Sequence, residues 1–100
     1  MNATLRDEVA SVLRVQEAVS NMHLRPEIAS LLMMTFHLVC REALAESGAL
    51  NADDRRRMCG LAADAVIAFA KAGLQPEQIR RFARSHLRFM SSGPEAAAAM

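Results

Sequence analysis

The spacing of apolar residues predicts four helices and no strand in this chain of 100 residues. Apolar positions recur every three or four residues, as they do on one face of a helix. No segment shows the strict apolar–polar alternation of a strand. We therefore expect an all-α fold, a small, dimeric bundle of about four helices that cover residues 4–22, 26–47, 52–72 and 76–90.

The expected helix ends coincide with residues that start or stop helices. Pro26 and Pro76 suit the first turn of a helix, because proline has no N–H to donate and its φ is already helical. Gly48 and Gly73 suit the position just after a helix, where the backbone turns left-handed. Asn51 is expected to cap the third helix through its side-chain oxygen.

The chain is expected to form one domain. Residues 1–90 are predicted to be a single helical domain, with no internal repeat and no long linker. The Ser-Ser-Gly-Pro stretch that begins at Ser91 is expected to break the last helix. Residues 91–100 are accordingly predicted to be a flexible C-terminal tail.

The predicted helix at 26–47 is apolar on two separate faces. At about 100° per residue, a wide stripe contains Ile28, Leu32, Met33, Phe36, Val39, Cys40, Ala43 and Leu44. A narrow stripe on the other side contains Leu31, Met34, Leu38 and Ala45. Thr35 and Glu42 form a thin polar strip between them. One apolar face is enough to build a core, so the second face needs another neighbour.

Three interpretations of the narrow stripe remain open. Leu31, Met34 and Leu38 could form the seam of a homodimer or the contact site for a target protein. They could instead be the hidden back of a central core helix that the other three helices surround.

The predicted fourth helix carries arginines opposite its apolar side. Ile79, Phe82 and Leu87 belong to the apolar side, and the other side contains Arg80, Arg81, Arg84 and Arg88. Four guanidinium groups on one face could bind phosphates or an acidic protein surface. They could equally form a solvated face that keeps the protein soluble.

The composition favours a protein that associates with itself. The apolar fraction is 52%, but the chain has four Phe, no Trp and no Tyr. The core is therefore expected to be aliphatic and thin, which favours a homodimer. The net charge of +1 gives no global field that would attract nucleic acid or a membrane.

The location is expected to be the cytoplasm. Both cysteines, Cys40 and Cys59, lie in apolar helical runs without a disulfide framework, which is typical of a reducing compartment. The N-terminus lacks the apolar core of a secretory signal. The apolar run of the helix at 26–47 is interrupted by Ser30, Thr35 and His37 and is shorter than the roughly 20 residues that a bilayer requires.

No catalytic residue, cofactor or metal site is predicted. His37 and Cys40 could touch one metal, but a zinc site needs three or four ligands and nothing supplies the others. Asp64 shares a narrow polar strip with Arg57 and Lys71, so it is interpreted as part of a solvated face. His86 falls on the apolar side of the last helix and is interpreted as a core or interface residue.

The segment at 69–88 resembles a helix-turn-helix. Gly73 matches the turn glycine, Leu74 the apolar residue after it, and Ile79 and Phe82 the inward positions of the second helix. The resemblance implies DNA binding through Gln75, Gln78, Arg80, Arg81 and Arg84. Phe69 departs from the family, which usually has a small residue at that position.

In size, helical content and lack of catalytic residues the chain is similar to small bacterial anti-activators and adaptors, such as quorum-sensing anti-activators. That likeness implies a homodimeric regulator that binds and inhibits or sequesters a transcription regulator. No residue motif carries it. DNA binding by the segment at 69–88 is one alternative, and a secretion chaperone or a phage-encoded inhibitor is another.

Overall fold

The fold is all-α. The computed structural model describes residues 3–48 and 51–98, with side chains for 9–46, 48 and 51–87. The described residues form four helices and no strand: α1 (Ala3–Asn21), α2 (Pro26–Ser47), α3 (Ala52–Lys71) and α4 (Pro76–Ala98). The predicted bundle of four helices is therefore confirmed.

The helix boundaries follow the predicted capping residues. Gly48 and Gly73 have φ values of 65° and 89°, so both occupy the left-handed region that favours glycine after a helix. Asn51 caps α3, since its side-chain Oδ1 accepts a hydrogen bond of 2.8 Å from the backbone N–H of Asp54.

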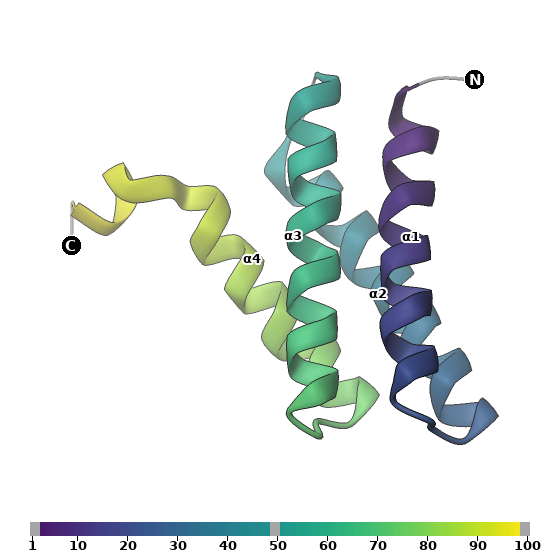
Figure 1. The fold of residues 1–100 in the computed structure, drawn as a ribbon. Coiled ribbons are helices and arrows are strands. Elements are labelled where there is room, and N and C mark those ends of the chain that lie inside the picture. Colours follow the sequence, from purple (N-terminus) through teal and green to yellow (C-terminus); the bar gives the residue numbers. More distant parts are fainter. Residues whose placement is uncertain (1–2, 49–50, 99–100) are drawn as a thin grey trace.

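The last helix is longer than predicted. Residues Ser91 to Pro94, expected to break it, lie within α4, which ends at Ala98. A proline inside a helix removes one hydrogen bond and kinks the axis, but the helix can continue beyond it. In Figure 1 the ribbon of α4 changes direction in its yellow, C-terminal part.

The four helices form two layers. Figure 1 shows α1 and α3 side by side and running in the same direction, with α2 behind them. Within the part of the chain that the structure describes, α2 and α3 each contact all three other helices, whereas no contact joins α1 to α4. The Cα extents of 42 × 37 × 17 Å describe a flat molecule, about two helices thick.

The core is aliphatic and rich in alanine, as the composition indicates. Its largest fully buried side chains include Phe36, Leu32 and Ile79. α3 contributes Ala62, Ala63 and Ala65, and these small side chains let the neighbouring helices approach closely.

The two helical hairpins, α1–α2 and α3–α4, share the same turn fifty residues apart. His23-Leu24-Arg25-Pro26-Glu27 corresponds to Gly73-Leu74-Gln75-Pro76-Glu77. His23 has a φ of 54°, in the same left-handed region as Gly73. The N–H of His23 donates to Ser20 O at 3.3 Å, and that of Gly73 donates to Ala70 O at 3.0 Å. The prediction of no internal repeat was wrong for this turn.

α2 combines high apolarity with a central position. Its segment Pro26–Glu46 has a mean hydropathy of 1.4 and, among the described residues, is the stretch long and apolar enough to cross a membrane. A core helix of a soluble protein passes the same test, and 33% of this stretch is buried inside the molecule. This stretch of 21 residues is longer than the apolar run predicted from the sequence, which was expected to be too short to cross a bilayer.

Candidate protein-binding surface

The narrow stripe of α2 lies on the outside of the molecule. Leu31 is 46% exposed and Met34 is 58% exposed, while Leu38 is half-buried. Ala45, the last member of the stripe, is also exposed. This exposure excludes the interpretation that Leu31 and Met34 form the hidden back of a core helix.

The wide stripe of α2 supplies the centre of the core. Leu32, Phe36, Val39, Cys40 and Ala43 are buried, and Ile28, Met33 and Leu44 pack partly buried against them. The same core cluster contains residues of the other three helices, such as Val15 of α1, Val66 of α3 and Ile79 of α4. The two apolar faces of α2 therefore have different surroundings within one chain.

The polar strip of Thr35 and Glu42, beside the narrow stripe, is less exposed to solvent than polar side chains usually are. Thr35 is buried, and its hydroxyl donates a 2.7 Å hydrogen bond to the carbonyl of Leu31 one turn earlier. A threonine that bonds to its own helix needs no water. Thr35 accordingly faces a neighbouring helix and not solvent.

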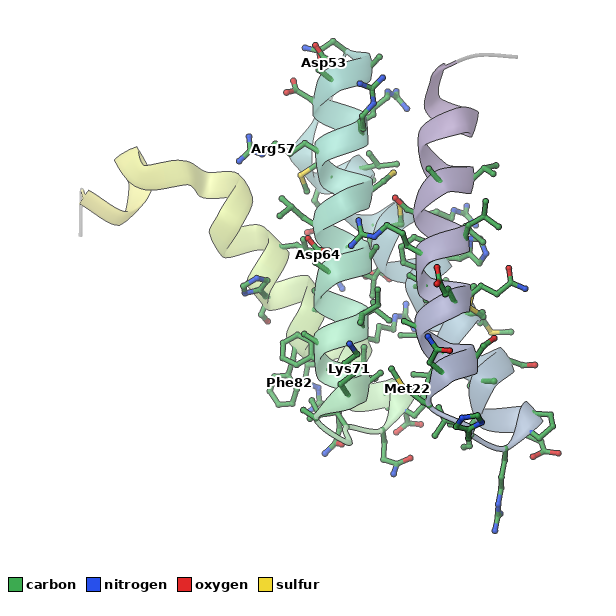
Figure 2. The ribbon with its side chains drawn as sticks, in the orientation of Figure 1. Met22, Asp53, Arg57, Asp64, Lys71 and Phe82 are labelled. Atoms are coloured by element: carbon green, nitrogen blue, oxygen red, sulfur yellow. The ribbon has the colours of Figure 1, made fainter. Side chains whose placement is uncertain are left out.

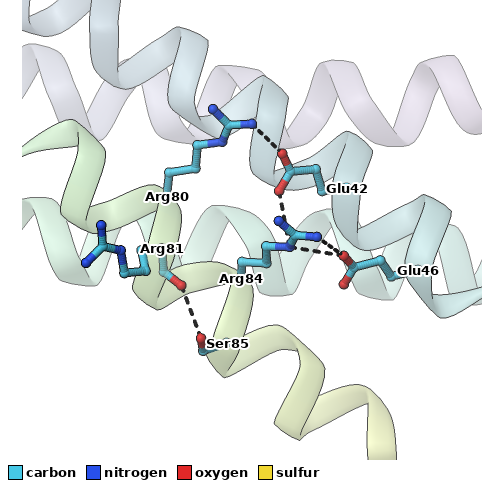
Figure 3. Close-up of polar contacts among 6 residues, drawn as sticks. All are labelled: Glu42, Glu46, Arg80, Arg81, Arg84 and Ser85. Atoms are coloured by element: carbon cyan, nitrogen blue, oxygen red, sulfur yellow. Dashed lines mark hydrogen bonds and ion pairs between the residues drawn. The ribbon is translucent and has the colours of Figure 1, made fainter.

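Glu42 and Glu46 of α2 pair with two of the four predicted arginines. Arg80 Nη2 lies 2.7 Å from Glu42 Oε1, and Arg84 Nη2 lies 2.6 Å from Glu46 Oε1. Arg84 Nε is also 3.6 Å from Glu42 Oε2, so that Arg84 bridges the two carboxylates (Figure 3). These contacts connect α4 to α2 and reduce the positive charge that this face offers.

Only part of the predicted arginine face pairs with α2. Figure 3 shows the Arg81 side chain directed away from Glu42 and Glu46, while its carbonyl accepts a 3.3 Å hydrogen bond from the Ser85 hydroxyl. The side chain of Arg88 lies outside those that the structure describes. An open depression of about 570 Å³ follows this part of α4, lined by Glu77, Arg80, Arg81, Arg84 and Ser85.

This pairing weighs against DNA binding by the segment at 69–88. Arg80 and Arg84 would have to leave Glu42 and Glu46 to reach phosphates, and those two carboxylates would then repel the DNA backbone. Of the two expected inward positions, Ile79 is buried but Phe82 is 48% exposed.

Phe82 belongs to an aromatic cluster on the outer side of the second hairpin. Its ring centroid is 6.3 Å from that of Phe69, and the His86 ring meets Phe69 edge-on at 6.5 Å. His86 is exposed. The core part of the interpretation of His86 is thus wrong for this chain on its own, and the alternative that His86 is an interface residue stays a prediction.

A second, apolar depression lies between the two equivalent turns. Its volume is about 310 Å³, and it is lined by Leu24, Arg25, Ile28, Leu32, Ala70, Gly73, Leu74, Gln75 and Pro76. It adjoins the first turn of α2, on the wide-stripe side of Ile28 and Leu32. It is therefore separate from the narrow stripe.

Asp64 belongs to a solvated polar face. Figure 2 shows Arg57, Asp64 and Lys71 one after another along α3. Asp64 forms an ion pair with Arg14 of α1, in which both side chains are more than half exposed. The interpretation of Asp64 as a surface residue is consistent with this position, but its partner on α1 was not predicted.

His37 and Cys40 do not come together with further metal ligands. The His37 ring centroid is 5.7 Å from that of Phe36, and the sulfur of Cys40 faces Cys59 of α3. Within the described part of the chain, no group of three or more His, Cys, Asp or Glu side chains could hold a metal ion.

Comparison with protein-family models, with curated proteins and with solved structures finds no match to this chain.

Proposed function

We propose that this chain is a non-enzymatic protein-binding module, a homodimeric cytoplasmic regulator that uses Leu31, Met34 and Leu38 of α2 as its contact surface. In this proposal it binds, and inhibits or sequesters, another protein. A transcription regulator is the class of target that its size and helical content suggest.

The observation that carries the proposal is an apolar strip, exposed at Leu31 and Met34, on a helix whose other side is the centre of the core. Its residues are spaced i, i+3 and i+7, which is the spacing of a seam where one helix packs against another. Among the described residues, the core cluster of the same chain contains the wide stripe of α2 and does not contain Leu31, Met34 or Leu38. An exposed apolar strip of this kind marks a contact surface.

Met34 suits a surface that accepts more than one neighbour. Methionine is unbranched and adapts its shape to the groove that it enters. The same strip can therefore form the seam between two copies or receive an amphipathic helix of a target.

The test is a charge placed in the strip. Met34→Glu and Leu31→Glu are each expected to weaken self-association by at least about tenfold, because a carboxylate would be buried in an apolar seam. Sedimentation over a range of concentrations measures the association, and circular dichroism checks that the helices remain.

Leu13→Glu is the matched control. Leu13 of α1 is 58% exposed, as Met34 is, so a glutamate there adds the same charge at an equally exposed apolar position. A strict monomer at micromolar concentration would contradict the homodimer. If Leu13→Glu weakened association and Met34→Glu did not, the contact surface would lie on α1.

The DNA-binding alternative gives a different result in a salt titration. Binding through phosphate contacts falls steeply as salt rises, and substitution of Arg80 and Arg84 by alanine would abolish it. An apolar seam on α2 predicts association that changes little over the same range of salt.

A further inference from the structure

The two cysteines of the chain meet in the core, although they come from different hairpins. Cys40 of α2 and Cys59 of α3 have their sulfurs 3.2 Å apart, and both side chains are buried. They are the chain's two cysteines, nineteen residues apart in sequence. The proposed contact surface on α2 does not use either thiol.

We propose that Cys40 and Cys59 are a site of reversible oxidation, at which a peroxide converts the two thiols into a disulfide that joins the two hairpins. A disulfide bond is about 2.0 Å long, so the sulfurs need to approach by only about 1 Å. This can come from small rotations of the two side chains, because α2 and α3 already pack against each other.

The reaction balances with hydrogen peroxide as the oxidant. One thiolate attacks the O–O bond and becomes a sulfenic acid, and the hydroxide that leaves takes up a proton to form water. The second sulfur then attacks the sulfenic sulfur, the S–O bond breaks, and a second water leaves. The two thiols lose two electrons, which reduce one peroxide to two waters.

The size of the oxidant follows from the burial of the sulfurs. A peroxide needs only a small local opening of the core, whereas a mixed disulfide with a bulky thiol would have to fit between packed helices. A small peroxide is therefore the class of oxidant that this site accepts.

The disulfide would join the two hairpins covalently. The disulfide would close a loop over residues 41–58, which includes the connection between α2 and α3. Closing that loop removes conformations from the unfolded chain and so favours the folded state. Leu31 and Met34 lie nearer the N-terminal end of α2 and are outside this loop, so their exposure is not expected to change.

The experiment treats the purified full-length chain with hydrogen peroxide, then denatures it and alkylates any remaining thiols. The expected product has lost two hydrogens, carries no alkyl group and regains two alkylatable thiols after reduction. Trypsin should release residues 15–41 joined to residues 58–71. The thermal midpoint should rise by about 5 °C or more on oxidation and return on reduction.

Cys59→Ala and Cys40→Ala are the controls, and neither should gain the link or the rise in thermal midpoint. The reduced wild-type chain provides a reference if either variant folds poorly. Thiols that stay alkylatable, sulfinic acids in place of the linked peptides, disulfides between chains, or a lower thermal midpoint after oxidation would each overturn the proposal.

Discussion

The two hairpins share one turn but differ in how much of their apolar surface they bury. In the first hairpin, α2 lies against three other helices and still has an exposed strip. In the second, α4 lies against α2 and α3 and carries arginines beside its apolar side. Phe36 of α2 is completely buried, whereas Phe82 of α4 is about half exposed. The place of a helix in the two layers, and not its local pattern alone, determines what is buried.

The largest difference in stability between equivalent substitutions in the two hairpins is expected at Phe36 and Phe82. Phe36→Ala should lower the free energy of unfolding by about 3–5 kcal/mol, because it leaves a cavity in the core. Phe82→Ala should cost only about 1 kcal/mol, mainly its contact with Phe69. Denaturant unfolding of both variants measures the two values. Equal losses would mean that Phe82 is buried in solution, for example beneath a second copy.

Substitutions at the left-handed residue of the shared turn are expected to change the free energy of unfolding in opposite directions in the two hairpins. Gly73→Ala should lower the free energy of unfolding by about 1–2 kcal/mol, because a side chain is unfavourable at a φ of 89°. His23→Gly should be neutral or stabilising, by up to about 1 kcal/mol, because glycine relieves the same strain. Thermal unfolding of the two variants is the measurement, and a large loss in His23→Gly would show that the imidazole has a stabilising contact.

At the offset of fifty residues that relates the two turns, Ala10 of the parallel helix α1 corresponds to Gly60 of α3. Gly60→Ala should raise the free energy of unfolding by about 0.5–1 kcal/mol, since alanine is the better helix former. An added Cβ would meet no atom within 4 Å. Ala10→Gly, on an exposed position of α1, should lower it by a similar amount. A loss of stability in Gly60→Ala would contradict the packing described for α3.

The smallest change in the free energy of unfolding is expected for substitutions of the arginines of α4. Arg84→Ala should cost about 0.5–1 kcal/mol, because Arg84 bridges Glu42 and Glu46 in a partly exposed network. Arg81→Ala should cost almost nothing. Unfolding at low and high salt tests this, and the Arg84 effect should shrink as salt screens the pairs. Equal effects in the two variants would mean that the network contributes nothing measurable.

Much of the fold could be predicted from local signals. Helix type, the cap at Asn51 and the left-handed Gly48 and Gly73 depend on neighbouring residues alone, and all agree with the structure. The end of α4 is the exception, because the Ser-Ser-Gly-Pro stretch from Ser91 to Pro94 is typical of a helix end but lies within this helix. The shared turn could have been found by comparing the two Leu-x-Pro-Glu stretches.

The candidate surface was predictable only in part. The narrow stripe follows from helical spacing, but its exposure at Leu31 and its partial burial at Leu38 depend on where α1, α3 and α4 lie. The pairing of Arg84 with Glu46 joins residues 38 positions apart, which no helical pattern contains. The contact of Cys40 with Cys59 likewise depends on the register of α2 against α3.

The arrangement of α1 also bears on how the chain folds during synthesis. α1 packs more extensively against α3 than against its sequence neighbour α2, and its ion pair from Arg14 reaches Asp64 fifty residues later. The first hairpin thus leaves the ribosome before its outer helix has its main partner. Contacts between distant residues slow folding, so the early apolar surface of α2 remains uncovered until α3 has been made.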